Sequence, residues 1–245
     1  MDQPTVDNSF SSELSLPPRI AHLIYKDRLD IAVKFSELLA TTGVTHGLIG
    51  PREVPRLWSR HILNCAIVQD VLEPGVAVAD IGSGAGLPGL ALAIARPDLQ
   101  LHLIEPLARR TTWLSSAVEE LGLTNVVIHH ARAEALAGQL AVPVVTARAV
   151  ARLAKLAMWA APLLSPGGEL VALKGASAYR ELEEDRQQIA VSGGCDSKVE
   201  LLGEGTLEDP TTLVRIRFIS AQKGNVRVKT SGKKKSRHSR RTQNQ

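Results

Sequence analysis

Residues 78–89 read VADIGSGAGLPG, and this stretch decides the fold class. It starts as an apolar, β-prone run that ends in Asp80, and Gly82, Gly84 and Gly86 follow in the next six residues. Glycine is needed where the backbone takes positive φ or where a ligand must touch the main chain. In doubly wound sheets such a turn, between a first strand and a helix, lies where ligands bind. The stretch therefore predicts a ligand-binding turn.

The spacing of these glycines bears on the class of ligand. A dinucleotide fingerprint requires G-x-G-x-x-G, which would place glycine at position 87, but this chain has Leu87. The turn is better suited to a ligand without a pyrophosphate, such as S-adenosylmethionine, whose carboxylate can accept backbone N–H bonds near a helix N-terminus. A nicotinamide cofactor is disfavoured but stays open.

Two acidic residues extend the candidate site. Glu105 ends the second predicted strand, where it would face the same crevice and accept hydrogen bonds from both hydroxyls of a ribose. Because both nicotinamide dinucleotides and S-adenosylmethionine contain that ribose, Glu105 does not separate them. Ala133 and Glu134 follow the third strand, where an adenine edge would lie, although an acid in a first helical turn is also ordinary capping.

Outward from the turn, apolar strands alternate with helical segments. Alternation of this kind predicts an α/β fold with a doubly wound, mostly parallel sheet. The last apolar run, residues 213–219, alternates with period two and suits a less buried strand near an edge. The expected strands are 76–81, 99–104, 126–130, 144–149, 170–173, 199–202 and 213–219, and the expected helices between them are 90–95, 109–121, 133–140, 153–164 and 179–191.

Composition shifts divide the chain into four regions. Residues 1–17 are polar and Ser-rich and are expected to be disordered, whereas 18–74 carry helical apolar spacing, interrupted at Gly43, and a second helical stretch at 54–72. Residues 75–222 form the expected ligand-binding core, and 223–245 form a basic disordered tail.

Charge is distributed unevenly along the chain. Residues 223–245 carry nine Lys/Arg and no acid, so the other residues hold 20 basic and 25 acidic side chains, a net charge of −5 within a total of +4. Such a tail is typical of a segment that binds a polyanion, most plausibly nucleic acid, or that simply aids solubility.

Composition also excludes several classes of protein. The 245 residues are 44% hydrophobic, yet no apolar run approaches the length of a spanning helix, and the first residues do not resemble a signal peptide. Cys65 and Cys195 lie far apart with no C-x-x-C spacing, which excludes a disulfide scaffold and a cysteine-built zinc site. We therefore expect a soluble, cytoplasmic protein that holds no metal.

The motifs together resemble a known family. DIGSGAGLPG, the preceding RHILN (60–64), and then HHARAEAL, TARAV and VALKG (171–175) occur in the order found in the glucose-inhibited division protein B family. The resemblance spans roughly residues 28–220. It implies a Rossmann-like class I methyltransferase fold with an N-terminal helical extension. It also implies an enzyme that uses S-adenosylmethionine to methylate N7 of one guanine in 16S rRNA of the small ribosomal subunit.

The resemblance also assigns cofactor contacts. They would fall on Gly82 and Leu87 in the turn, with Gly84 between them, on Ala133 and Glu134 beside the adenine, and on Arg148 in the ARAV segment. Glu105 stands where the family has an acid after its second strand.

Guanine N7 keeps a free lone pair, so the implied reaction needs no general base. Positioning of the reacting atoms in line would supply most of the catalysis. Arg148 and Lys174, at the ends of the fourth and fifth strands, are the expected positioning residues for RNA phosphate or the guanine edge. His61 and Arg60 could line the substrate mouth, with a purely structural histidine equally open.

Two segments depart from the family pattern. His46–Ile49 replaces a Tyr-Asn-Leu-Thr segment, and Asn64 replaces the aspartate that ends the RHILD motif. Three tryptophans (58, 113 and 159) are scattered over helical segments and are expected in the core or an interface, which argues against a base-stacking platform. A monomer is expected, and a nicotinamide oxidoreductase and a non-enzymatic RNA-binding protein remain as alternatives.

Overall fold

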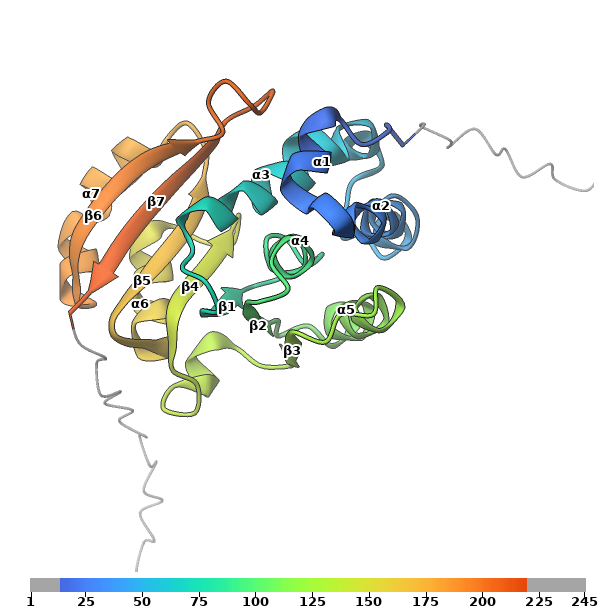
Figure 1. The fold of residues 1–245 in the computed structure, drawn as a ribbon. Coiled ribbons are helices and arrows are strands. Elements are labelled where there is room, and N and C mark those ends of the chain that lie inside the picture. The colour runs from blue at the N-terminus through green and yellow to red at the C-terminus, as the bar shows by residue number, and fades with distance from the viewer. Residues whose placement is uncertain (1–13, 220–245) are drawn as a thin grey trace, which may run out of the picture.

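The computed structural model describes residues 14–219. The expected basic tail and nearly all of the expected disordered start lie outside the described residues. The described part is built around one sheet of seven strands (Figure 1). The strands are β1 (Ala77–Ile81), β2 (Gln100–Ile104), β3 (Val126–His129), β4 (Val142–Arg148), β5 (Leu164–Lys174), β6 (Gly194–Leu202) and β7 (Thr211–Phe218).

The strand order confirms a doubly wound, mostly parallel sheet. The order is β3-β2-β1-β4-β5-β7-β6, and the pairs from β3 to β5 are all parallel. Strand β7 is antiparallel to both of its neighbours, β5 and β6. The order reverses between β1 and β4, which creates a topological switch point beside the end of β1, where ligands bind in sheets of this type.

Helices cover both faces of the sheet. One face carries α4 (Gly89–Ala95) and α5 (Ala108–Glu120), and the other carries α6 (Leu153–Ala160) and α7 (Ala178–Val191) (Figure 1). Short 3₁₀ turns complete the second face, namely η6 (Ala133–Leu136) and η7 (Ala161–Leu163). In residues 14–219 no helix combines the length and apolarity needed to cross a membrane.

The N-terminal extension packs on the α4 side of the sheet. Its core residues share one hydrophobic cluster with α4, α5 and the facing side chains of β1 and β2. The elements are α1 (Arg19–Tyr25), η1 (Lys26–Arg28), α2 (Leu29–Leu38), the π-helical η2 (Leu39–Gly43), η3 (Pro51–Arg56), the π-helical η4 (Leu57–Ile62), α3 (Leu63–Ala66) and η5 (Ile67–Val71). The expected helical stretch over 54–72 is present as a series of short helical segments, from η3 to η5.

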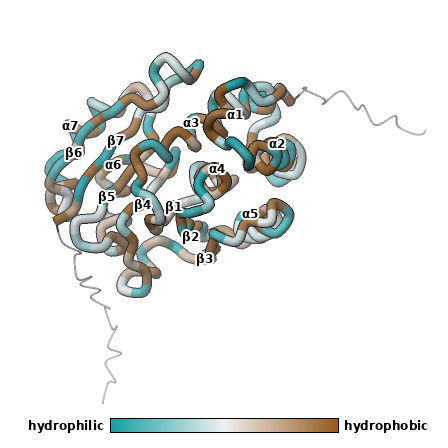
Figure 2. The backbone as a smooth tube through the Cα atoms, in the orientation of Figure 1, coloured by the Kyte–Doolittle hydropathy of each residue, from teal (hydrophilic) through white to brown (hydrophobic). Residues whose placement is uncertain are grey.

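Alternation along the strands divides the core into two halves. Val78 and Leu101 face the cluster of the extension, whereas Ala79 and Ile104 face the cluster of α6 and α7. Side chains at successive positions of a strand point to opposite faces, so strands buried on both faces are largely apolar. Figure 2 shows the central strands mainly in hydrophobic colours, while β6 at the edge carries more hydrophilic segments.

Two expectations about the elements were wrong. The run 213–219 does lie near an edge, because β7 is the neighbour of the edge strand β6, but it is not less buried, since most of its side chains are buried between β5 and β6. Its alternation arises because Arg215 forms ion pairs with Glu169 of β5 and Glu200 of β6, which allows a charged residue inside the sheet. The expected helix over 133–140 is only the short turn η6.

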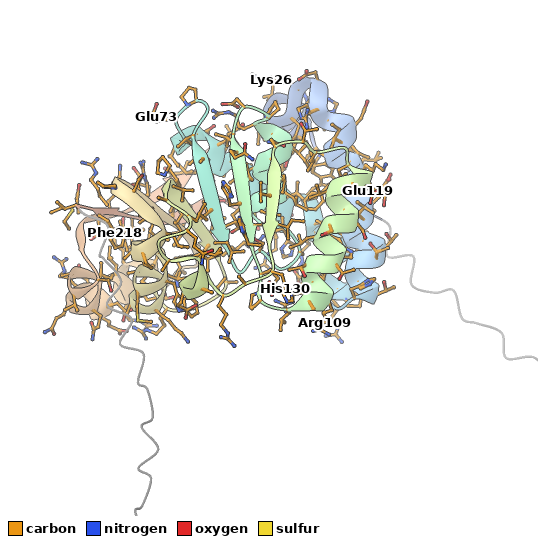
Figure 3. The ribbon with its side chains drawn as sticks, turned by 90° about the horizontal axis from the view of Figure 1, so that it is seen from below. Lys26, Glu73, Arg109, Glu119, His130 and Phe218 are labelled. Carbon is orange, nitrogen blue, oxygen red and sulfur yellow. The ribbon has the colours of Figure 1, made fainter. Side chains whose placement is uncertain are left out.

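All parallel strands end at one edge of the sheet. In the view of Figure 3, Arg109 and His130, which follow β2 and β3, lie at this edge, and Glu73, which precedes β1, lies at the opposite one. We call this the carboxyl edge. The glycine turn after β1 opens onto it.

Candidate functional site

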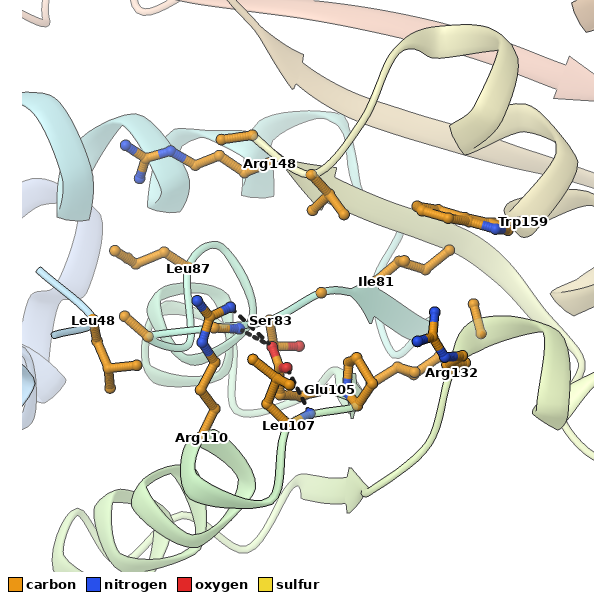
Figure 4. Close-up of a pocket in the computed structure, with 18 of the residues that line it drawn as sticks. Leu48, Ile81, Ser83, Leu87, Glu105, Leu107, Arg110, Arg132, Arg148 and Trp159 are labelled. Carbon is orange, nitrogen blue, oxygen red and sulfur yellow. Dashed lines mark hydrogen bonds and ion pairs between the residues drawn. The ribbon is translucent and has the colours of Figure 1, made fainter. Parts of the chain in front are cut away.

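A pocket of about 580 Å³ lies at the carboxyl edge, at the switch point between β1 and β4 (Figure 4). Its size falls in the range of pockets that hold small molecules and cofactors. The lining comes from the turn after β1, the segments that follow β2, β3 and β4, and two parts of the N-terminal extension.

Asp80 fastens the glycine turn from behind. Its side chain is fully buried, and its Oδ2 accepts a hydrogen bond from the backbone N–H of Gly89 at 3.1 Å. A Cβ atom on Gly89 would lie 2.2 Å from a methyl carbon of Leu103 and 2.8 Å from Asp80 Oδ2, so glycine is required there for close approach. Burial raises the pKa of Asp80 to about 6. The carboxyl group is therefore a structural clamp between strand and helix.

Glu105 fixes the front of the same turn. The residue is 1% exposed, and its two oxygens accept backbone N–H bonds, Oε1 from Leu107 at 3.0 Å and Oε2 from Gly84 at 3.1 Å. Glu105 nevertheless lines the pocket, so the remaining lone pairs of its carboxylate can accept bonds from a ligand. This arrangement links the second strand to the glycine turn and presents an acceptor beside it.

Arg110 brings a cation into the pocket, where it forms a long ion pair with Glu105. Its Nη1 lies 3.7 Å from Glu105 Oε2, close enough for an ion pair but too long for a hydrogen bond. Its Nε is buried and has no hydrogen-bond partner among the described residues. Figure 4 shows the guanidinium directed at Glu105 from the first turn of α5. A buried donor without a partner is costly, so this group is placed to bind a ligand acceptor.

On the opposite side of the pocket, Arg148 at the end of β4 is held by the N-terminal extension. Its guanidinium donates to the carbonyls of Arg60 at 3.1 Å and His61 at 3.4 Å, and to His61 Nδ1 at 2.7 Å. It also donates to Cys65 Sγ at 3.1 Å. Burial raises the pKa of the Cys65 thiol, so the sulfur acts as a neutral acceptor. Arg148 thus joins β4 to a segment more than 80 residues earlier in the chain.

The segment after β3 forms the third side. Ala133 is buried at the start of η6, and the neighbouring Glu134 is exposed, although both line the pocket. Arg132 precedes them and also lines it. The small alanine leaves room for a flat group between this segment and the one that follows Glu105.

The structure brings together the residues that the sequence indicated for a cofactor. All seven line the one pocket, and they are Gly82, Gly84, Leu87, Glu105, Ala133, Glu134 and Arg148. They come from four separate segments, namely the turn after β1, the segment after β2, the 3₁₀ turn η6 and the end of β4.

Lys174 does not belong to this group. It is absent from the pocket lining, and its Nζ forms an ion pair with Glu181 Oε1 at 2.8 Å and donates to the carbonyl of Ala151 at 3.1 Å. Lys174 is thus held by partners within the protein, and its expected role beside RNA stays a prediction. Its side chain is only 13% exposed and ties the end of β5 to α7.

Several residues that line the pocket were not predicted as site residues from the sequence. Leu48 and Ile49 line the pocket from the loop after α2, within the segment that departs from the family pattern. Trp159 also lines it and is half-buried, whereas Trp58 and Trp113 are buried as expected. Arg110 was not predicted either, and the sequence feature that could have indicated it is its place in the first helical turn after Glu105. For Leu48 and Trp159 no local sequence pattern indicates a place in the pocket.

The second departure, Asn64, lies away from the pocket lining. Its carbonyl accepts a bond from Thr211 Oγ1 at 3.1 Å, and its buried Oδ1 has no hydrogen-bond partner within residues 14–219. No cluster of three or more His, Cys, Asp or Glu that could hold a metal ion occurs in the same residues.

Comparisons with known proteins agree with this geometry. The family described as rRNA small subunit methyltransferase G matches residues 28–209. The "Ribosomal RNA small subunit methyltransferase G" of Arthrobacter sp. (strain FB24) is 54% identical over 205 residues, which cover 84% of this chain and 95% of that one. The protein of the same name from Streptomyces avermitilis is 47% identical over 228 residues, covering 93% of this chain and 95% of that one.

This chain belongs to the rRNA small subunit methyltransferase G family. Among solved structures, M. jannaschii TYW2 in complex with AdoMet matches with a TM-score of 0.51 and 16% identity, over 67% of this chain and 78% of that one. That likeness concerns the fold and confirms the class I methyltransferase architecture. Membership of the rRNA small subunit methyltransferase G family confirms the expectation of an S-adenosylmethionine-dependent methyltransferase, and neither a nicotinamide oxidoreductase nor a non-enzymatic protein is favoured.

Proposed function

We propose that this chain transfers the methyl group of S-adenosylmethionine to N7 of a guanine in 16S rRNA. The observation that carries the proposal is the pocket itself, in which a glycine turn and the buried Glu105 meet at the switch point of a class I methyltransferase sheet. Family membership supports the rRNA substrate, and the guanine and its N7 atom follow from the family resemblance.

The residues of the pocket fit this cofactor. Glu105 offers carboxylate lone pairs to ribose hydroxyls, and Ala133 and Glu134 border the region where adenine would lie. The buried, unpartnered Nε of Arg110 marks a place for an anionic group, and the cofactor's carboxylate is the anion that it would receive. Leu87 and Gly82 would lie against its amino-acid part.

The bound cofactor supplies an electrophilic methyl group on a sulfonium ion. The chain's own residues act by positioning, since guanine N7 already carries a lone pair and no side chain must remove a proton. The four Nη hydrogens of Arg148 are donated to the N-terminal extension, so its Nε–H is the donor left to offer guanine O6 while N7 stays free. Orientation of this kind can contribute about 7–11 kcal/mol to the lowering of a barrier.

Charge at the pocket mouth supports an RNA substrate. Arg110, Arg132 and Arg148 line the pocket from three different segments and would attract phosphate groups toward it. We propose that the basic residues 223–245 add a second, sequence-independent contact to RNA. We also propose that the protein acts in the cytoplasm as a monomer, on 16S rRNA or on the small subunit that contains it.

The test is transfer of a labelled methyl group. The protein is incubated with methyl-labelled S-adenosylmethionine and, in parallel, with naked 16S rRNA and with small subunits from cells that lack this activity. We expect label in the RNA of at least one of the two, and the ratio between them identifies the substrate. Tight RNA binding with no label in either would overturn the proposal in favour of a non-enzymatic RNA-binding protein.

A further inference from the structure

Three side chains form a chain of short hydrogen bonds from the protein surface to the pocket. Glu53 Oε2 lies 2.8 Å from His61 Nε2, and His61 Nδ1 lies 2.7 Å from Arg148 Nη2. They come from η3, η4 and the end of β4. His61 and Arg148 line the pocket, but Glu53 does not. Through the histidine, Glu53 is linked by hydrogen bonds to a pocket that it does not line.

The chemistry of the partners fixes the state of the imidazole ring. A guanidinium can only donate, so His61 Nδ1 must accept and must carry no proton. The ring is then the neutral tautomer with hydrogen on Nε2, and this hydrogen is donated to the carboxylate of Glu53. A protonated ring would lose the acceptor and would place two cations side by side. The neutral ring with hydrogen on Nε2 is thus the one protonation state that satisfies the contacts with both Glu53 and Arg148.

We propose that Glu53 and His61 are positioning residues that hold the guanidinium of Arg148 at the pocket wall. The inference rests on the proposed function, because Arg148 is the side chain expected to contact the guanine or the cofactor. Two carbonyls and Cys65 Sγ also hold this guanidinium, but the contact with His61 is the shortest of the set. Glu53 orients the ring, as second partners commonly do for functional histidines.

The surroundings of His61 agree with a neutral ring. Burial, with the positive charge of Arg148 as a further cause, lowers the pKa of His61, although the hydrogen bond from its ring to Glu53 acts in the opposite direction. The ring thus stays neutral at pH 7 and becomes charged only on acidification. The titratable and charged groups that surround it are Glu53 and Arg56 on η3, Arg60 on η4, Cys65 on α3 and Arg148 on β4.

Nitrogen NMR of the histidine rings tests the proton arrangement directly. The full-length protein is labelled with ¹⁵N-histidine, and the His61 signals are assigned by their loss in His61→Gln. We expect a neutral ring with hydrogen on Nε2 at pH 7, and in Arg148→Gln we expect the pKa of His61 to rise. Hydrogen on Nδ1, or a charged ring at pH 7, would overturn the inference whether or not the protein proves to be a methyltransferase.

Matched variants test whether the chain of bonds matters for function. In Glu53→Ala we expect kcat/KM for RNA methylation to fall about tenfold, because small misplacements of positioning groups are costly. Glu53→Gln, which keeps an acceptor for His61, should restore most of it. Arg56→Ala is the control, since Arg56 pairs with the other oxygen of Glu53 at 2.7 Å and not with the one that contacts His61.

A double-mutant cycle separates positioning from a general loss of stability. In an Arg148→Gln background, Glu53→Ala should cause no further loss of kcat/KM, because both residues act through the same hydrogen-bond chain, and melting temperatures of all variants show that they are folded. An equal loss in Glu53→Ala and Arg56→Ala, or additive losses with Arg148→Gln, would overturn the inference. Failure of the wild-type protein to methylate RNA would instead overturn the proposed function.

Discussion

The two walls of the pocket are built in different ways. The turn wall, residues 81–87 with Glu105, consists largely of backbone that is fixed by Glu105 from the neighbouring strand, through the bond from Gly84 N–H. The extension wall, formed by Leu48, Ile49, His61 and Arg148, consists of side chains from two distant segments. We propose that the two walls have different roles: the turn wall binds the cofactor, and the extension wall orients the RNA base.

The largest effect is expected from a methyl group placed in the turn wall. In Gly82→Ala the new Cβ would lie 2.8 Å from Val150 Cγ2, at a residue whose φ is +71°. The turn or the Val150 segment must then move, and we expect the affinity for S-adenosylhomocysteine to fall about 100-fold, or about 2.7 kcal/mol. Titration calorimetry measures it.

Gly75→Ala is the matched control for that experiment. Gly75 has a φ of +69°, nearly the same backbone strain, but a Cβ atom there would meet no atom within 4 Å. Equal losses of affinity in the two variants would mean that strain alone is responsible and that the turn is not part of the binding site.

The clamp behind the turn wall predicts a pH-dependent stability. Folding raises the pKa of Asp80 from 3.8 to about 6, so the folded protein binds a proton more tightly than the unfolded chain. The contribution of Asp80 to stability is thus fully present below about pH 4 and is lost as the pH rises through 6. Relative to Asp80→Asn, the wild-type protein should gain about 2–3 kcal/mol in free energy of unfolding between pH 7 and pH 4. Denaturant titrations measure the free energies of unfolding of the two proteins. A difference between them that stays the same at pH 7 and pH 4 would contradict the raised pKa of Asp80.

Arg110 tests which part of the cofactor the turn wall holds. We expect Arg110→Gln to weaken S-adenosylhomocysteine about tenfold, or about 1.4 kcal/mol. It should leave 5′-methylthioadenosine, which lacks the amino-acid part, bound as in the wild type. An equal loss for both ligands would place Arg110 beside the ribose and Glu105 instead of the carboxylate.

The smallest effect is expected at Lys174, the residue that lies outside both walls. In Lys174→Met, Glu181 loses its ion pair but keeps the bond from the backbone N–H of Leu153 at 2.7 Å. We expect a loss of about 1 kcal/mol in stability. The kcat/KM for RNA methylation should stay within about twofold of the wild-type value, a range that represents under 0.5 kcal/mol. A tenfold loss, with stability unchanged, would restore Lys174 as a positioning residue.

The two walls also differ in how far they could be predicted. The turn wall could be predicted from local sequence. The glycines follow one apolar strand and Glu105 follows the next, and both strands of a parallel sheet end at the carboxyl edge. The extension wall depends on tertiary packing. Leu48 and His61 reach the pocket only because short helical segments, two of them π-helical, fold back over α4, and no periodicity encodes that path.

The remaining differences between expectation and structure have the same origin. Arg148 and Lys174 both follow apolar strands, but α7 supplies Glu181 as a partner to the lysine alone. Likewise, the alternation in β7 indicated a less buried strand because the partners that allow Arg215 inside the sheet lie on two other strands. In each case the deciding contact joins residues that are not neighbours in sequence.

Identification of the methylated nucleoside tests the central claim most directly. Small-subunit RNA from cells lacking this activity is methylated with labelled S-adenosylmethionine by the wild-type protein and by Gly82→Ala, digested to nucleosides and separated. We predict that 7-methylguanosine carries the label and that the label falls sharply in the variant. Label on any other nucleoside, or equal labelling by the two proteins, would contradict the account.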